Sequence, residues 1–272
     1  MTSVAPAARP APAAPRRPTK PRPSWTLWAG LAAAAVLTVW AGLGIDFTLV
    51  PLFTDFARGW VVIEQFLAPN WGFIFQVGNA WFETLSIAVL ASLVGCTAGL
   101  IAAMLASNVT LSNPVAHQVV KWSLSVVRSI PDIGYAFLFV ALVGVGSLAG
   151  ILALIMFNLG IVAKLTSESI DAVDRGPIEA VDASGASGVD RARWAVYPQV
   201  LPNFLSYSLY VFELNIRASI VIGLAGAGGI GNVIIVQLGR FAWENVSALF
   251  IATFVVVLLV DIASQVIRRR IT

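Results

Sequence analysis

The sequence predicts an all-α integral membrane protein with six transmembrane helices. Hydrophobic residues make up 58% of the 272-residue chain, charged residues make up only 11%, and the mean hydropathy is +0.85. A soluble domain could not bury that much apolar surface, whereas a lipid bilayer can cover it. Six apolar runs of about membrane length occur along the chain, and this even number places both chain ends on one side of the bilayer.

The N-terminal part combines a polar tail, one span and a surface helix. Residues 1–24 are basic and rich in Ala and Pro, so we expect them to be disordered. The apolar run 25–45 is long enough to span and too long for a signal peptide, although a cleaved signal remains the alternative. Between 46 and 80, apolar and charged side chains fall on opposite helical faces, which is typical of a helix on the membrane surface. We therefore treat 25–75 as one span plus an extracytoplasmic interfacial helix.

Five further spans are predicted downstream. They cover residues 84–105, 119–145, 148–170, 203–224 and 246–266. In the first of these, Gly95 and Gly99 stand four residues apart, which lets another helix approach closely. Pro131 predicts a break within the next span. Pro198 and Pro202 are expected to stop the helix ahead of the fifth span and to set the angle at which that span begins.

The only long polar segment between membrane-length apolar runs is the loop at 172–200. Glu179 and Asp182 favour the positive end of a helix dipole, and Gly185 permits the turn that ends the helix. The resulting helix, 177–187, has two or three turns and is too short to be stable alone. We expect it to be a docking element that connects the buried helices to water-soluble machinery.

The loop also carries a recognisable spacing. Three residues after Glu179-Ala180-Val181 comes Gly185, and nine residues after that comes Ala195-Val196-Tyr197-Pro198. This segment resembles the cytoplasmic EAA loop of ABC importer permeases, Glu-Ala-Ala, three residues, Gly, nine residues, Ile-x-Leu-Pro. The spacing matches in full, and the departures are apolar exchanges at Val181, Ala195 and Tyr197. The region 76–268 is similar to the phosphonate importer permeases in particular, through three segments: 130–132, 212–219 and 226–231.

This resemblance implies the type I, MetI-like permease fold over residues 76–268 and a function. The chain would be the permease subunit of an ATP-driven importer of phosphonates or related phosphorus oxyanions. It would pair with a second permease subunit, identical or paralogous, with two cytoplasmic ABC ATPases and with an extracytoplasmic substrate-binding protein. ATP and Mg²⁺ would bind to the ATPase, so no cofactor is expected in this chain. The residues expected to couple to the ATPase are Glu179, Ala180, Asp182, Ala183, Gly185 and Pro198.

Two alternatives to this function stay open. One is a MetI-like permease for another small solute, because the loop pattern is shared across substrates. The other belongs to a different class, a secondary transporter driven by ion gradients, which inverted internal repeats would favour.

The fifth span carries polar side chains on two opposite faces. At 100° per residue, Glu213 and Arg217 share one face. Asn215 and Ser219 lie on the opposite face. A helix of this kind cannot turn either side to lipid, so we expect it at the centre of the bundle. Glu213 and Arg217 could neutralise each other, or Arg217 could favour an anion in a path; Asp132 could likewise cap freed backbone or line that path.

The glycine-rich segment after the fifth span matches a nucleotide-binding pattern only superficially. Gly226, Gly228, Gly229 and Gly231 fit G-x-G-x-x-G, but the segment follows a membrane helix rather than a strand. We expect a flexible or tightly packed turn at the outer mouth, and the resemblance implies that it lies near the external gate. No Walker A motif occurs, and the only histidine, His117, is expected to be solvated or capping in a loop, so no metal site is predicted.

The positive charges predict the orientation of the chain. Of its 17 Lys and Arg residues, fourteen fall on one side, Arg58 and Arg240 on the other, and Arg217 within a span. The termini and the loop 172–200 are therefore expected in the cytoplasm of a bacterium, with the spans in its inner membrane.

The basic residues do not indicate a nucleic-acid partner. They lie at the ends of apolar runs, where they meet lipid headgroups. Since no nucleophile and base stand at convincing spacing, we do not expect an enzyme.

Overall fold

The computed structural model describes residues 24–111 and 113–271, and every regular element in them is a helix. The chain divides into two compact units, Met1–Arg58 and Gly59–Thr272, which are described separately. The tail 1–24, expected to be disordered, lies outside the described residues except for Ser24.

The first unit contains α1 (Trp25–Gly44), which agrees with the first predicted span. This helix has 20 residues, is apolar enough to cross a membrane and has no residue buried by its own chain. A helix that is apolar all round needs lipid or a partner around it. The segment expected to lie on the membrane surface begins in this unit with α2 (Val50–Thr54). It continues across the boundary between the units with the amphipathic α3 (Phe56–Phe66), and α4 (Trp71–Gln76) belongs to the second unit.

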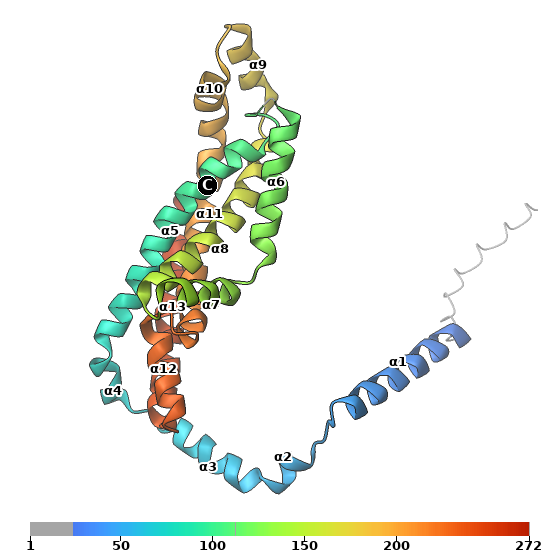
Figure 1. Ribbon diagram of the computed structural model, residues 1–272, viewed down its shortest axis with the longest axis vertical. Coiled ribbons are helices and arrows are strands. Elements are labelled where there is room, and N and C mark those ends of the chain that lie inside the picture. Colours follow the sequence, from blue (N-terminus) through green and yellow to red (C-terminus); the bar gives the residue numbers. More distant parts are fainter. Residues whose placement is uncertain (1–23, 112, 272) are drawn as a thin grey trace, which may run out of the picture. The chain divides into compact units, whose positions relative to one another are not determined.

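The second unit is a bundle of long helices (Figure 1). Its elements are α5 (Gly78–Ala106), α6 (Pro114–Ser129), α7 (Asp132–Val143), α8 (Ser147–Asp171), α11 (Tyr197–Leu224), α12 (Gly229–Gly239) and α13 (Trp243–Ile271). With α1, and with α6 and α7 taken as one broken span, the described residues hold up to six candidate spans. Because α11 contacts α5, α7, α8, α12 and α13, its expected central position is confirmed.

The predicted break at Pro131 is a sharp bend rather than a kink in a straight span. The axes of α6 and α7 differ by 86°. Proline has no amide N–H, so the carbonyl of Val127, four residues earlier, loses its helical partner. The hydroxyl of Tyr135 takes that place and donates to the Val127 carbonyl at 2.7 Å. Tyr135 is only 3% exposed, so this buried carbonyl is satisfied across the bend.

The expected helix stop ahead of the fifth span is wrong. The helix runs on from α10 (Gly188–Arg191) through one π-helical stretch, Ala192–Val196, into α11. Within it, the amide of Tyr197 bonds the carbonyl of Ala192, five residues back. This wider turn gives the backbone room ahead of Pro198, and Pro202 then lies inside α11. The two prolines therefore shape the helix without ending it.

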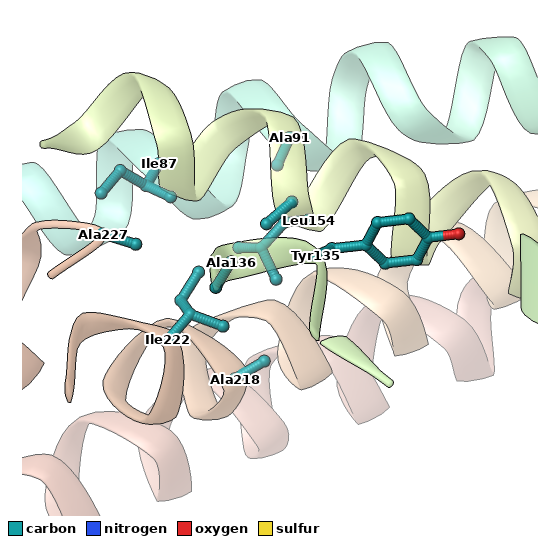
Figure 2. Packing of buried hydrophobic residues seen from close by; sticks show 9 residues of the cluster. Ile87, Ala91, Tyr135, Ala136, Leu154, Ala218, Ile222 and Ala227 are labelled. Atoms are coloured by element: carbon teal, nitrogen blue, oxygen red, sulfur yellow. The ribbon is translucent and has the colours of Figure 1, made fainter. Parts of the chain in front are cut away.

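Close packing joins α5 to α8, as the glycine spacing predicts. A Cβ atom on Gly95 would lie 2.6 Å from Cβ of Asn158, and one on Gly99 would lie 2.9 Å from Cβ of Val162. Only glycine fits at such distances. A neighbouring cluster of buried side chains joins α5, α7, α8 and α11 (Figure 2), and its largest members are Ile87, Tyr135, Leu154 and Ile222.

Candidate coupling element and transport path

The helix expected at 177–187 in the polar loop is α9 (Arg175–Ala183), which starts two residues earlier than expected and ends earlier, and the short helix α10 follows it. Asp174 caps it by accepting the amide of Gly176 at 3.1 Å. The helix leans on the bundle, as its length requires, through Ile178 and Val181. Both pack against a cluster from α5, α8, the π-helical stretch and α11 that contains Ala103, Ile170, Ala195, Val196 and Val200. Figure 1 shows α9 and α10 at one end of the second unit, here called the coupling end.

The outward face of α9 carries most of the residues expected to couple to an ATPase. Glu179, Ala180 and Ala183 are exposed, and so is Pro198 at the start of α11. Gly185 follows the helix with φ at +75°, a left-handed conformation that glycine adopts without strain. This face of α9 is therefore free to meet another protein.

Asp182 has a partner within the chain. Its carboxylate accepts from Nε of Arg191 at 2.7 Å, which holds α9 against α10. The start of α10 is a capping box, in which the Asp190 amide donates to the Ser187 hydroxyl at 3.3 Å and the Ser187 amide donates to the Asp190 carboxylate at 3.2 Å. The Ser187 hydroxyl in addition donates to that carboxylate at 2.6 Å. This hydrogen bond stabilises the carboxylate and lowers the pKa of Asp190 below its usual value. These contacts stabilise the turn between the two short helices.

Polar contacts hold the bundle together at the end of α8 and at the start of α9. Asp171, the last residue of α8, accepts from the Ser107 hydroxyl at 2.6 Å and from Nζ of Lys121 on α6 at 3.3 Å. The backbone amide of Asp174 donates to the side chain of Gln199 on α11 at 3.0 Å. A displacement of α9 would therefore act on α11 through Asp174, and on α8 and α6 through the short connection that joins α9 to Asp171.

The predicted ion pair in the fifth span is present. Glu213 is buried, pairs with Arg217 one turn later and lies 3.5 Å from Arg268 on α13. The side chain of Arg217 is 51% exposed, so the cation reaches out from the helix while its carboxylate partner stays inside. On the other face, Asn215 is fully buried and donates to Ser92 of α5 at 2.7 Å, and Ser219 donates to its own helix. These two residues lie in helix packing here, not at an open surface.

Asp132 stands at the start of α7, directly after the bend. Its carboxylate accepts the amide of Ile133 at 2.9 Å, and the side chain is only partly exposed. This contact satisfies one of the amides that a helix start leaves without a partner. Asp132 thus contacts local backbone at the start of α7, whose N-cap residue is Pro131.

The glycine-rich segment is a tightly packed turn. Gly226, Gly228 and Gly229 have φ values of +87°, +84° and +71°. A Cβ on Gly228 would lie 2.6 Å from the carboxylate of Glu83, and Gly231 leaves no room beside the carbonyl of Ile220. The turn contacts α5 near its start, at Glu83 and Thr84, and α8 at its first residue, Ser147, whereas α8 meets the coupling end at its last turn, through Ile170. It therefore lies toward the end of the bundle opposite α9.

A polar groove of about 380 Å³ opens beside α9, between α8 and α11. Its lining includes Glu168, Ser169, Asn203 and Tyr207, with the Ser169 and Tyr207 hydroxyls 2.9 Å apart. Glu168 forms an ion pair with Lys164 one turn earlier. Polar side chains that line a groove within a membrane bundle mark a candidate path for a hydrophilic solute.

The sequence interpretation missed Arg128 as a residue of this region. It counted Arg128 only among the cations of one side, whereas the structure places it on a second cavity, between α6 and α8. The available signal was a charged residue inside an apolar run, three positions before Pro131.

The expectation for His117 was wrong. Asn113 caps α6, which begins at Pro114, so His117 lies in a helix and is only 7% exposed. No three potential metal ligands converge within the described residues.

This bundle, with one short helix docked on its end, defines a class of membrane transport subunits. Residues 95–272 match the family of binding-protein-dependent transport system inner membrane components, and the chain belongs to this family. It is therefore the permease subunit of an ABC importer, a multi-span inner membrane protein and not an enzyme, and the expected fold is confirmed.

Relatives and solved structures agree with this assignment. The phosphite transport system permease protein PtxC of Stutzerimonas stutzeri is 36% identical over 187 residues, which are 69% of this chain and 68% of the relative. The putative cryptic phosphonate transport system permease protein PhnE2 of Escherichia coli K12 is 40% identical over 118 residues, 43% of this chain and 97% of the relative. An inward-facing structure of the MetNI methionine ABC transporter superposes with a TM-score of 0.65 at 22% identity, covering 73% of this chain and 97% of that chain.

Proposed function

We propose that this permease imports phosphonates or related phosphorus oxyanions and that a partner ATPase drives it. The observation that carries the coupling is α9, which buries Ile178 against its own bundle and leaves Glu179 and Ala180 exposed. The substrate class is supported by the relatives named for phosphite and phosphonate transport. Two permease subunits, identical or paralogous, would form the path, each docking one cytoplasmic ATPase, and an extracytoplasmic binding protein would deliver the substrate.

The proposed mechanism is a lever. ATP and Mg²⁺ bind to the ATPases and draw them together, and α9, held in a groove of its ATPase, moves with them. The tethers at Asp171 and Gln199 pass this displacement to α6, α8 and α11, and the bundle switches between inward-facing and outward-facing states. In this assignment the coupling end and both chain termini are cytoplasmic, and the glycine-rich turn lies near the external gate.

Uptake into liposomes tests this function. The permease is reconstituted with its ATPase and binding protein, and uptake of radiolabelled methylphosphonate and phosphite is measured with ATP, without ATP, and with an imposed ion gradient alone. We expect uptake only with ATP. Uptake supported by the gradient alone would favour a secondary transporter, and ATP-driven uptake of methionine in place of the oxyanions would favour another MetI-like substrate.

A further inference from the structure

A small polar cavity lies between α6 and α8. It has a volume of about 90 Å³, room for several water molecules or one tetrahedral oxyanion. The polar residues that line it are Lys121, Ser125, Arg128, Lys164, Ser167 and Glu168. Three basic side chains therefore converge on one cavity that contains a single carboxylate.

The charges at this cavity do not cancel. Lys164 pairs with Glu168, and Lys121 pairs with Asp171. No carboxylate pairs with Arg128 among the residues that the structure describes, and its guanidinium contacts only the Ser125 hydroxyl, at 3.4 Å. One positive charge is therefore left without a carboxylate partner at the edge of this cavity.

Gly160 positions this arginine. A Cβ atom on Gly160 of α8 would lie 2.7 Å from Cγ of Arg128, so the absence of a side chain lets the arginine stem lie directly on α8. Gly160 stands 11 residues before the end of α8, roughly 16 Å from the coupling end at 1.5 Å per residue. Arg128 is exposed there, and a charge within a membrane span is costly to turn toward lipid. We therefore expect this side of the α6–α8 pair to face a water-filled path or another subunit.

We propose that this cavity binds a phosphate-type oxyanion on its way through the permease, an inference that deepens the proposed function and rests on it. The Arg128 guanidinium offers paired N–H donors that match phosphoryl oxygens, and the two lysines add positive potential. The Ser125 and Ser167 hydroxyls already donate to carbonyls of their own helices, so the cations supply the donors. Glu168 and Asp171 offset two of the three positive charges and leave an excess of one, which keeps binding weak enough for the anion to leave.

Phosphate binding to the purified permease–ATPase assembly tests the site. Radiolabelled inorganic phosphate is the probe, and its binding to the detergent-solubilised complex is measured by equilibrium dialysis. Phosphate bound to the ATPase is the same for all variants, so it cancels when variants are compared. Losing one charge-assisted contact is expected to weaken binding about tenfold in Arg128→Gln. Gly160→Ala keeps every charge but displaces the arginine stem, so it should weaken binding similarly, and Arg128→Lys should retain part of it. Arg269→Gln, an exposed arginine near the C-terminus, is the matched control.

The outcomes separate two sources of the oxyanion. If Arg128→Gln loses one copurifying phospholipid per permease chain, and added phosphate does not displace that lipid from the wild type, the occupant is a lipid headgroup. The cavity would then bind an oxyanion, but not one that is being transported. Equal phosphate binding and equal lipid content in wild type, Arg128→Gln and Gly160→Ala, all eluting as intact complexes, would overturn the proposal. Because binding is measured without transport, a wild type that binds phosphate but imports no phosphorus oxyanion would refute the proposed function alone.

Discussion

Gly185 is the residue on which the shape of the coupling element depends most. Its φ of +75° is costly for any side chain and most costly for a β-branched one, by about 1–2 kcal/mol. We expect Gly185→Val to abolish ATPase docking and transport while membrane insertion stays intact, as measured by copurification of the ATPase. Gly188→Val is the control, since Gly188 has no positive φ and open space around it. Normal recovery of the ATPase with Gly185→Val would contradict this role.

Tyr135 stabilises the bend between α6 and α7. Tyr135→Phe removes the hydroxyl that serves the Val127 carbonyl and leaves a buried acceptor without a partner, at a cost of about 1–3 kcal/mol. The melting temperature of the detergent-solubilised permease should fall. Tyr210→Phe, at a partly exposed tyrosine, should leave it unchanged. Equal melting temperatures for the two variants would show that the hydroxyl does not hold the bend.

Asp190 gives the start of α10 a defined pH dependence. Its pKa is lower in the folded chain than in the unfolded chain, so its stabilising effect is fully present above the unfolded pKa of about 4. The effect is lost as the pH falls through the lowered folded pKa. Hydrogen exchange of the amides of Gly188–Arg191 should therefore be constant from pH 7 to about 4, after correction for the intrinsic rate, and should accelerate below it. Asp190→Asn should exchange faster than wild type above that range.

At the scale of elements, the tether at Asp171 is expected to transmit force between α9 and α6. Asp171→Asn weakens the contact with Lys121 while keeping a side chain of the same size. Uptake should fall about five- to tenfold with ATP hydrolysis retained, which is the signature of lost coupling. The exchange of charges, Lys121→Asp with Asp171→Lys, should restore part of the uptake. Loss of uptake and hydrolysis in equal proportion would assign Asp171 to stability instead.

Helical elements were predictable where one local property decides them. Apolar length located the spans, and the missing amide of Pro131 located the bend, because both effects act within a few residues. The path of the chain at Pro198 and the burial of His117 were not predictable in this way. The first depends on a π-helical turn, and the second depends on where α6 begins and what packs against it. The proposed role of Arg128 was not predictable either, because it depends on contact with Gly160, which is 32 positions later in the chain.

At the scale of the whole molecule, labelling of introduced cysteines tests the proposed orientation. The chain's single natural cysteine, Cys96, sets the background. Cys96 is buried, so it should not react with a membrane-impermeant maleimide. Ala180→Cys, on α9, should be labelled only in inverted membrane vesicles. Arg240→Cys, after α12, should be labelled only from the outside of intact cells. Labelling of both positions from the same side would refute the topology.

The packing beneath α9 has a consequence for partner choice. Two of the three departures from the EAA pattern, Val181 and Ala195, lie in the same apolar cluster of this chain. One side chain is larger than the usual residue and the other is smaller, so their volumes compensate. The surface presented outward by Glu179 and Ala180 is therefore left in its common form. ATPases of related uptake systems should therefore be able to power this permease, because two of its three departures pack against its own bundle and only Tyr197 is exposed.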